Sequence, residues 1–465
     1  MFPKPLLACI FTACAIILCS CKKDRPLTPA NLVISNISDT GATISWNEAK
    51  YANSYAVYIS TDMAFTSLVA GYTPSLVQGL NTSTTQLKAG THYFVKVIAK
   101  GNGESSPVQA EFTTVDGDGL VIVGSDDNSI YALNARNGNG VWRFHTGAAV
   151  SATPVIQDST VYVGSQDGKL YAIDVWYGIQ KWVTNKVPSA SFIGAPVNVY
   201  KGTIYVGDYG GWVYAFDAAN GHEKWRYILP SPYRNVNTAA VVPNDSTVYI
   251  GSYDGKIYDL DAATGLPRWW TSSTGNPLVS GLALANNTLY VGALPKVYAF
   301  DAGTGALKWR TTTPVYALFE VSPTISGDNV LIGDEGGNFY SYSATDGTMK
   351  WSRALSSGSI GCNPVVSGGV VYTDGGSGTF YALDIATGNT VWMNNLSTKG
   401  LYCGPVVTDK YIYTGTLDGQ FYCMEKATGL IKWSVTIDGA RFNSSPTVIT
   451  NGGKTFQPGA AGTVQ

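Results

Sequence analysis

The chain has 465 residues, a formal net charge of −2, and only 13% charged side chains, against roughly 25% in typical soluble proteins. This near-neutral balance shows no basic surplus, which argues against a nucleic-acid partner and against a membrane contact driven by charge. The 52 Gly and 29 Tyr residues are typical of a protein built from strands and turns.

The N-terminus predicts a signal for export. Lys4 precedes an apolar run over residues 6–18, which is too short to cross a membrane as a helix but suits a signal peptide. The run ends in Leu18-Cys19-Ser20-Cys21, which resembles the lipobox of bacterial lipoproteins. That resemblance implies that residues 1–20 are removed, that Cys21 is acylated, and that residues 21–28 form a tether. The alternative is an ordinary cleaved signal with an incidental Cys.

Residues 29–115 predict a β-sandwich, because short alternating strands follow one another about every ten residues between turn residues. Trp46, the stretch 87–93 that ends in Tyr93, and the turn 103–107 resemble a fibronectin type III domain. The resemblance implies a spacer or docking module. Residues 116–118 form a short Gly-containing hinge.

Residues 119–453 contain a repeat of the form Y-A-x-D-x-x-x-G-x-x-x-W. Eight Trp residues end these segments, 40 to 44 positions apart, and such a period indicates stacked repeats or propeller blades. We interpret each Trp as a wedge that docks one blade on the next. The docking residues are Trp142, Trp182, Trp225, Trp269, Trp309, Trp351, Trp392 and Trp433.

The strands of the repeats predict how the propeller closes. The first repeat lacks its opening strand, and one such strand, 445–449, is left over after Trp433. Placing it beside residues 120–124 completes eight blades and leaves no exposed sheet edge. The predicted fold class is therefore all-β: a fibronectin type III-like sandwich, then an eight-bladed β-propeller closed by a C-terminal strand, with residues 454–465 as a tail.

Individual positions of the repeat have structural interpretations. The Gly four positions before each Trp predicts a turn with a strained backbone, and the Asp eight positions before it predicts an acceptor for turn amides. Cys423 stands where most repeats have Ala, so we expect a small core residue. Cys362 and Cys403 occupy matching places in adjacent repeats, which leaves open a disulfide between them.

The repeat resembles the tryptophan docking motif of pyrroloquinoline-quinone (PQQ)-type propellers, a family that includes quinoprotein dehydrogenases. Those enzymes resemble one another in an adjacent Cys-Cys pair over the quinone, and no such pair follows the signal segment here. The three His residues, His92, His145 and His222, are scattered along the chain, which argues against a His-based metal site or triad. We therefore predict no catalytic residue, no cofactor and no metal.

The connections from each Trp strand to the next repeat predict a binding face. Repeat proteins place variable loops on one face, and these loops carry aromatic residues beside Arg and Asn, a mixture found in recognition surfaces. The alternative is that the rings fill the channel. The candidate residues are Phe192, Tyr233, Arg234, Asn235, Asn237, Tyr316, Phe319, Glu320, Tyr402, Arg441, Phe442 and Asn443.

The lipid anchor, the blade number and the lack of enzymatic groups resemble the family of propeller lipoproteins in the bacterial outer-membrane barrel-assembly machine. That resemblance implies a noncatalytic scaffold on the outer membrane, facing the periplasm or the cell surface and binding a protein partner. A glycan-binding or adhesive surface lipoprotein is the alternative, since aromatic rings on a rigid mouth can stack on sugars. A PQQ-dependent dehydrogenase is the third hypothesis.

Overall fold

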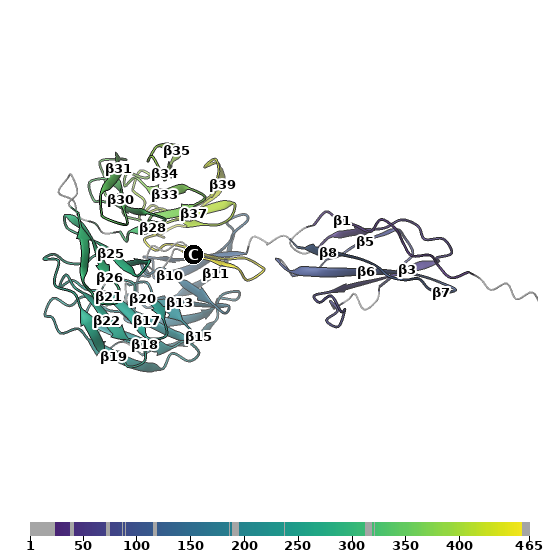
Figure 1. The fold of residues 1–465 in the computed structure, drawn as a ribbon, viewed down its shortest axis with the longest axis horizontal. Coiled ribbons are helices and arrows are strands. Elements are labelled where there is room, and N and C mark those ends of the chain that lie inside the picture. Colours follow the sequence, from purple (N-terminus) through teal and green to yellow (C-terminus); the bar gives the residue numbers. More distant parts are fainter. Residues whose placement is uncertain are drawn as a thin grey trace, which may run out of the picture. The chain divides into compact units, whose positions relative to one another are not determined.

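The computed structural model describes residues 24–37, 41–70, 75–85, 87–88, 90–114, 119–185, 187, 195–236, 238–311, 319 and 321–457. Over these residues the chain forms strands and no helix (Figure 1). The chain divides into two compact units, residues 1–117 and 118–465. The signal segment, Cys21 and the hinge 116–118 lie outside the described residues. Within the described part, none of the chain forms a helix long and apolar enough to span a membrane.

The first unit contains two antiparallel sheets. Strands β1, β2 and β5 form one, and β4, β3, β6 and β7 form the other, in which β8 also pairs with β6. Their inner side chains form one core, where the rings of Trp46 and Tyr55 lie 5.2 Å apart. The strands are β1 (Val33–Ser35), β2 (Thr43–Ser45), β3 (Ser54–Ser60), β4 (Ser75–Val77), β5 (Asn81–Ser83), β6 (His92–Gly101), β7 (Gly103–Glu104) and β8 (Val108–Thr113).

Tyr93 lies where the sequence predicts a tyrosine corner. Its buried hydroxyl accepts a hydrogen bond of 2.8 Å from the backbone amide of Lys88, so it ties the start of β6 to the segment before it. Pro26 and Leu27, which the sequence assigns to the tether, contact this unit: Pro26 is buried, and Leu27 donates to the backbone oxygen of Lys50 over 3.1 Å. The assignment as a fibronectin type III domain stays a prediction.

The second unit is a β-propeller, which confirms the predicted class. Its described strands fall into eight antiparallel sheets: seven have four consecutive strands each, and one has five strands, the first three and the last two of the unit. Seven of the sheets are β12 (Val155–Gln157), β13 (Thr160–Gly164), β14 (Leu170–Asp174) and β15 (Gln180–Val183); β16 (Asn198–Tyr200), β17 (Thr203–Gly207), β18 (Trp212–Asp217) and β19 (Glu223–Ile228); β20 (Val241–Asn244), β21 (Thr247–Gly251), β22 (Ile257–Asp261) and β23 (Pro267–Trp270); β24 (Ala283–Ala285), β25 (Thr288–Ala293), β26 (Lys296–Asp301) and β27 (Leu307–Arg310); β28 (Thr324–Ser326), β29 (Asn329–Gly333), β30 (Asn338–Ser343) and β31 (Met349–Ala354); β32 (Val365–Ser367), β33 (Val370–Asp374), β34 (Thr379–Asp384) and β35 (Thr390–Asn395); and β36 (Val406–Val407), β37 (Tyr411–Gly415), β38 (Gln420–Glu425) and β39 (Ile431–Thr436).

The remaining sheet joins the two ends of the propeller. It has the order β11-β10-β9-β40-β41 and consists of β9 (Leu120–Ser125), β10 (Ser129–Asn134), β11 (Gly140–His145), β40 (Thr447–Ile449) and β41 (Thr455–Phe456). Strand β40 pairs antiparallel with β9, with Val448 opposite Val121. The last strand therefore returns to the first sheet, as predicted. Residues 455–456, which the sequence assigns to a tail, instead extend this sheet as β41.

The docking Trp residues join neighbouring blades. Each indole packs on the Gly of the following repeat's turn: a Cβ on Gly347 would lie 2.6 Å from the ring of Trp309. In seven of the eight, the indole nitrogen donates to a backbone oxygen of that turn, at 2.9 to 3.2 Å. These pairs are Trp142 with Val175, Trp182 with Ala218, Trp225 with Ala262, Trp309 with Ala344, Trp351 with Ile385, Trp392 with Lys426 and Trp433 with Ala135.

Two features make room for this docking. In seven of the eight blades a small third-strand residue lies directly opposite the Trp, as Ala299 lies opposite Trp309, whereas Asp259 lies opposite Trp269. Cys423 lies opposite Trp433 and is 2% exposed, which confirms the expected small core residue. The turn Gly has a positive φ, +71° at Gly305, and the preceding Asp301 accepts hydrogen bonds from the turn amides of Gly303 and Thr304, both at 3.0 Å.

Candidate binding face

The alternating direction of the strands places two kinds of loop at one end of the propeller. These are the hairpin turns between the second and third strands of each blade and the connections from the fourth strand to the next blade. Backbone hydrogen bonds join the two kinds of loop. The amide of Tyr253, in one turn, donates to the backbone oxygen of Asn235, in a connection, over 3.0 Å. The amide of Asp126 likewise donates to the backbone oxygen of Arg441 over 3.1 Å. We call this end the candidate binding face.

The connection between β19 and β20 carries an exposed ring on a fixed backbone. The Tyr233 side chain is 77% exposed, while its backbone amide donates to the Ser231 hydroxyl over 3.2 Å. Next to it, Arg234 packs along Gly211 and donates from Nε to the backbone oxygen of Gly210 over 2.8 Å. The conformation of this connection is therefore set by the neighbouring turn, and the Tyr233 ring is left free for a ligand.

Tyr402, Arg441 and Asn443 also lie at this end. Tyr402 is 36% exposed and packs on Gly361, where a Cβ would lie 2.3 Å from its ring. Arg441 is exposed. Asn443 donates from Nδ2 to Oδ2 of Asp126 over 2.5 Å. Burial raises the pKa of Asp126, while the charge of Arg441 opposes the rise.

Two of the predicted face residues, Phe319 and Phe442, lie in the core instead, and both are 0% exposed. Each fills the space beside a Gly at the end of the second strand of its blade: a Cβ on Gly292 or Gly415 would lie 2.6 Å from the Cβ of the corresponding Phe. The prediction that they form the surface is wrong because that missing Cβ makes a pocket for one large side chain. Other blades fill the same place with Val150 beside Gly124, Val236 beside Gly207 and Ile360 beside Gly333.

The sequence held a signal for this packing. These core residues follow the strand-ending Gly by 26 to 29 positions, so the two Phe residues align with Val and Ile in other repeats. Four further candidates, Phe192, Asn237, Tyr316 and Glu320, lie outside the described residues.

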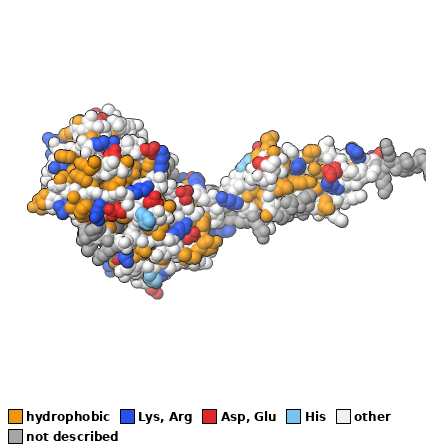
Figure 2. Space-filling view, turned by 90° about the horizontal axis from the view of Figure 1, so that it is seen from below, with side chains coloured by type: hydrophobic (Ala, Val, Ile, Leu, Met, Phe, Trp, Pro, Cys, Tyr) orange, Lys and Arg blue, Asp and Glu red, His pale blue; other side chains and the backbone are white. Residues whose placement is uncertain are grey.

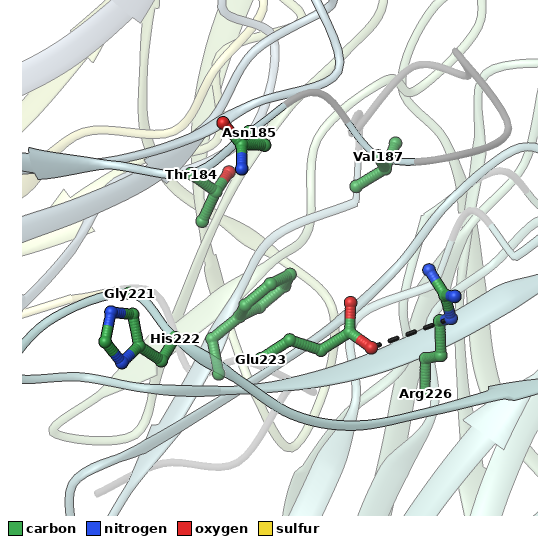
Figure 3. Close-up of a pocket in the computed structure, with 8 residues that line it drawn as sticks. Thr184, Asn185, Val187, Gly221, His222, Glu223 and Arg226 are labelled. Carbon is green, nitrogen blue, oxygen red and sulfur yellow. Dashed lines mark ion pairs between the residues drawn. The ribbon is translucent and has the colours of Figure 1, made fainter.

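Of the hollows on the described surface of the propeller, two have similar volumes. One, of about 370 Å³, is at the candidate binding face and includes Tyr233 and Tyr253. The other, of about 390 Å³, lies between the second and third blades near Thr184 and His222, and holds an ion pair of 3.6 Å between Glu223 and Arg226 (Figure 3). On the face drawn in Figure 2, hydrophobic side chains alternate with charges of both signs. Neither hollow is strongly charged.

One pair of buried titratable groups, Cys362 and Asp374, lies behind the candidate binding face. The Cys362 thiol donates to Oδ1 of Asp374 over 3.0 Å, and both side chains are nearly inaccessible. Burial raises the pKa of the Cys362 thiol well above its usual range, which opposes its use as a nucleophile. The structure has Cys362 and Cys403 as free thiols, so the disulfide that the sequence left open is not formed.

The described residues do not fit the groups expected of a quinoprotein site. The three Cys side chains of the propeller belong to separate repeats and are buried, and across the described ranges no three His, Cys, Asp or Glu side chains come together as a metal site. The fold of the described residues after 118 defines a β-propeller.

The chain belongs to the family described as outer membrane protein assembly factor BamB, whose model matches residues 82–293 and 253–400. BamB from Moraxella catarrhalis is 21% identical, with a TM-score of 0.55 over 64% of this chain and 90% of that one. The computationally designed Ika8 protein is 18% identical, with a TM-score of 0.57 over 69% and 93%. Quinohemoprotein alcohol dehydrogenase from Comamonas testosteroni is 18% identical, with a TM-score of 0.54 over 68% and 73%. At these identities the likeness shows the fold, and no curated protein matches the chain.

Proposed function

We propose that this chain is a noncatalytic binding scaffold of the bacterial envelope, which holds a protein partner at the candidate binding face in an outer-membrane assembly role. The observation that carries the proposal is the family match to outer membrane protein assembly factor BamB. The exposed Tyr233, Tyr402 and Arg441 at one end of a rigid propeller support it, since aromatic and Arg side chains are the usual anchors of protein interfaces.

In this proposal, acylated Cys21 anchors the chain to the outer membrane, and the sandwich of residues 29–115 is a fibronectin type III spacer. The lipobox-like residues 18–21 support the anchor, and the tyrosine-corner hydrogen bond of Tyr93 supports the spacer. We expect Cys21→Ser to move the protein from the membrane fraction to the soluble fraction. A protein that stays in the membrane fraction after this change contradicts the anchor.

The partner site is tested by photo-crosslinking in intact cells. A photoreactive amino acid replaces Arg441 or Tyr402, and the control position is Tyr177, which is 74% exposed but lies in a docking turn, away from the candidate binding face. We expect a discrete crosslinked envelope protein from the two face positions and not from Tyr177. Equal crosslinks from all three positions, or none from the face, would overturn the proposed site.

A further inference from the structure

The groove at the candidate binding face is built from three consecutive loops. Tyr233 comes from the connection between β19 and β20, Tyr253, Asp254 and Lys256 come from the turn between β21 and β22, and Ser273 and Asn276 come from the connection between β23 and β24. We call these six residues the tyrosine groove. Its volume of about 370 Å³ is within the range of small-ligand sites.

Both tyrosine rings are offered to solvent from an anchored backbone. Tyr233 is 77% exposed and Tyr253 is 36% exposed, whereas their backbone amides are held by Ser231 at 3.2 Å and by Asn235 at 3.0 Å. The fold gains little from leaving a Tyr ring in water. The backbone that carries the two rings is therefore held in place, so a ligand that stacks on them has only their side chains to order.

The polar side chains of the groove are oriented but retain hydrogen-bonding capacity. Asp254 accepts from the Tyr258 hydroxyl over 2.6 Å and from the Lys256 amide over 3.1 Å, and a carboxylate has about four lone-pair positions. Asn276 donates from Nδ2 to the backbone oxygen of Leu294 over 2.8 Å, which uses one of its several amide donors and acceptors. The groove can thus both donate to and accept from a ligand.

The backbone of the groove offers little to an extended peptide. Three of its backbone amides already donate to backbone oxygens: Gly255 to Ser252 over 3.0 Å, Thr274 to Gly255 over 2.9 Å and Leu278 to Ser252 over 3.2 Å. A peptide that adds a strand needs free backbone groups at a sheet edge. Lys256 and Asp254 carry opposite charges, so the charges of the groove favour neither a cation nor an anion.

We propose that the tyrosine groove binds a neutral saccharide built from hexopyranose rings. The C–H face of such a ring carries partial positive charge and fits the negative face of Tyr233 or Tyr253. Its hydroxyls, each a donor and an acceptor, match the carboxylate, amide, hydroxyl and ammonium groups around them. This site goes beyond the proposed protein scaffold and does not depend on it.

The test is isothermal titration of the full chain with three neutral oligosaccharides: maltohexaose, cellohexaose and laminarihexaose. We expect at least one to bind, and Tyr233→Ala to weaken its binding about tenfold, since the stacking face is lost. Tyr233→Phe keeps that face, so it should stay within about threefold of the native affinity. Tyr177→Ala, which removes an equally exposed ring elsewhere, is expected to change nothing.

Three results would overturn the saccharide site. The first is no binding of any of the three sugars. The second is binding that Tyr233→Ala leaves intact. The third is a peptide from an unfolded outer-membrane protein that binds in a Tyr233-dependent manner while the sugars do not. The crosslinks at Arg441 report on the protein partner separately, so failure of one proposal is distinguishable from failure of the other.

Discussion

The indole nitrogen of Trp433 donates a hydrogen bond of 3.0 Å to the backbone oxygen of Ala135, which lies 298 positions earlier in the chain. The Tyr413 hydroxyl reaches the same oxygen over 3.2 Å, and the Trp433 ring packs on Gly138. This contact docks the last complete blade on the first one. Together with the pairing of β40 and β9, it closes the propeller.

Removal of residues 446–465 is expected to open this closure. Strand β9 would lose its neighbour β40 and expose an unpaired edge, which favours association between chains. We expect loss of a single cooperative unfolding transition and the appearance of oligomers in size-exclusion chromatography. Removal of residues 458–465 alone, which leaves β40 and β41 in place, is the control. A monomeric, cooperatively folded 446–465 deletion would contradict the role of β40.

Trp309 and Trp269 differ in the docking hydrogen bond, and also in the residue opposite the indole, which is Ala299 for Trp309 and Asp259 for Trp269. The indole nitrogen of Trp309 donates to the backbone oxygen of Ala344 over 3.1 Å. The indole nitrogen of Trp269 is buried without a partner, and the backbone oxygen of Ala302 in the corresponding turn accepts from the Tyr249 hydroxyl instead, over 2.6 Å. Replacement by Phe leaves a similar cavity in both. We expect Trp309→Phe to lower the free energy of unfolding by about 1 kcal/mol more than Trp269→Phe, measured by urea denaturation. Equal losses would show that the hydrogen bond contributes nothing net.

Substitution by Ala at Gly347 and at Gly368 distinguishes the cost of backbone strain from the cost of disturbing the docked Trp309 ring. Both have a positive φ, +76° and +61°, so Ala at either position is strained by about 1 kcal/mol. A Cβ at Gly347 would also meet the Trp309 ring at 2.6 Å, whereas a Cβ at Gly368 meets nothing within 4 Å. Gly347→Ala is therefore expected to cost clearly more stability than Gly368→Ala. A similar loss at both positions would mean that the ring moves aside freely.

The repeats allowed the blades, the closing strand and the turn glycines to be predicted, because those features depend on residues within one repeat or on a count of strands. The contact of Gly347 with Trp309 could not be derived in this way, since spacing within a repeat does not show which neighbouring side chain approaches a Gly. The error at Phe319 has a different cause: its place in a long connection suggests the surface, although its spacing of 27 positions from Gly292 is like that of core Val and Ile residues in other repeats, and it fills the space beside Gly292. Tyr233, by contrast, is exposed where the sequence expected it.

Incubation with PQQ and calcium tests whether the propeller can act as a dehydrogenase. We expect no retained chromophore after gel filtration and no dye reduction with alcohol substrates. The reason is that Cys362 and Cys403 are buried free thiols in separate repeats, and no adjacent Cys-Cys pair follows the signal segment in the sequence. A stoichiometric chromophore with dye-reducing activity would contradict the noncatalytic proposal.

Asp374 makes the stability of the propeller depend on pH. Burial raises its pKa to about 6, although the Cys362 thiol and neighbouring amides lower it. Since the folded pKa is above the unfolded one, the folded state binds the proton more tightly, and stability is lost as pH rises from about 4 through 6. A shift of about two units corresponds to about 3 kcal/mol.

The variant Asp374→Asn removes this titration and keeps an acceptor for the amide of Gly361. We expect the stability of the variant relative to the native protein to rise by about 3 kcal/mol between pH 4 and pH 7, measured by urea denaturation at several pH values. Other titrating groups cancel in this difference. A difference that stays constant with pH would show that Asp374 is ionised with an ordinary pKa in the folded protein, because water or a cation reaches it.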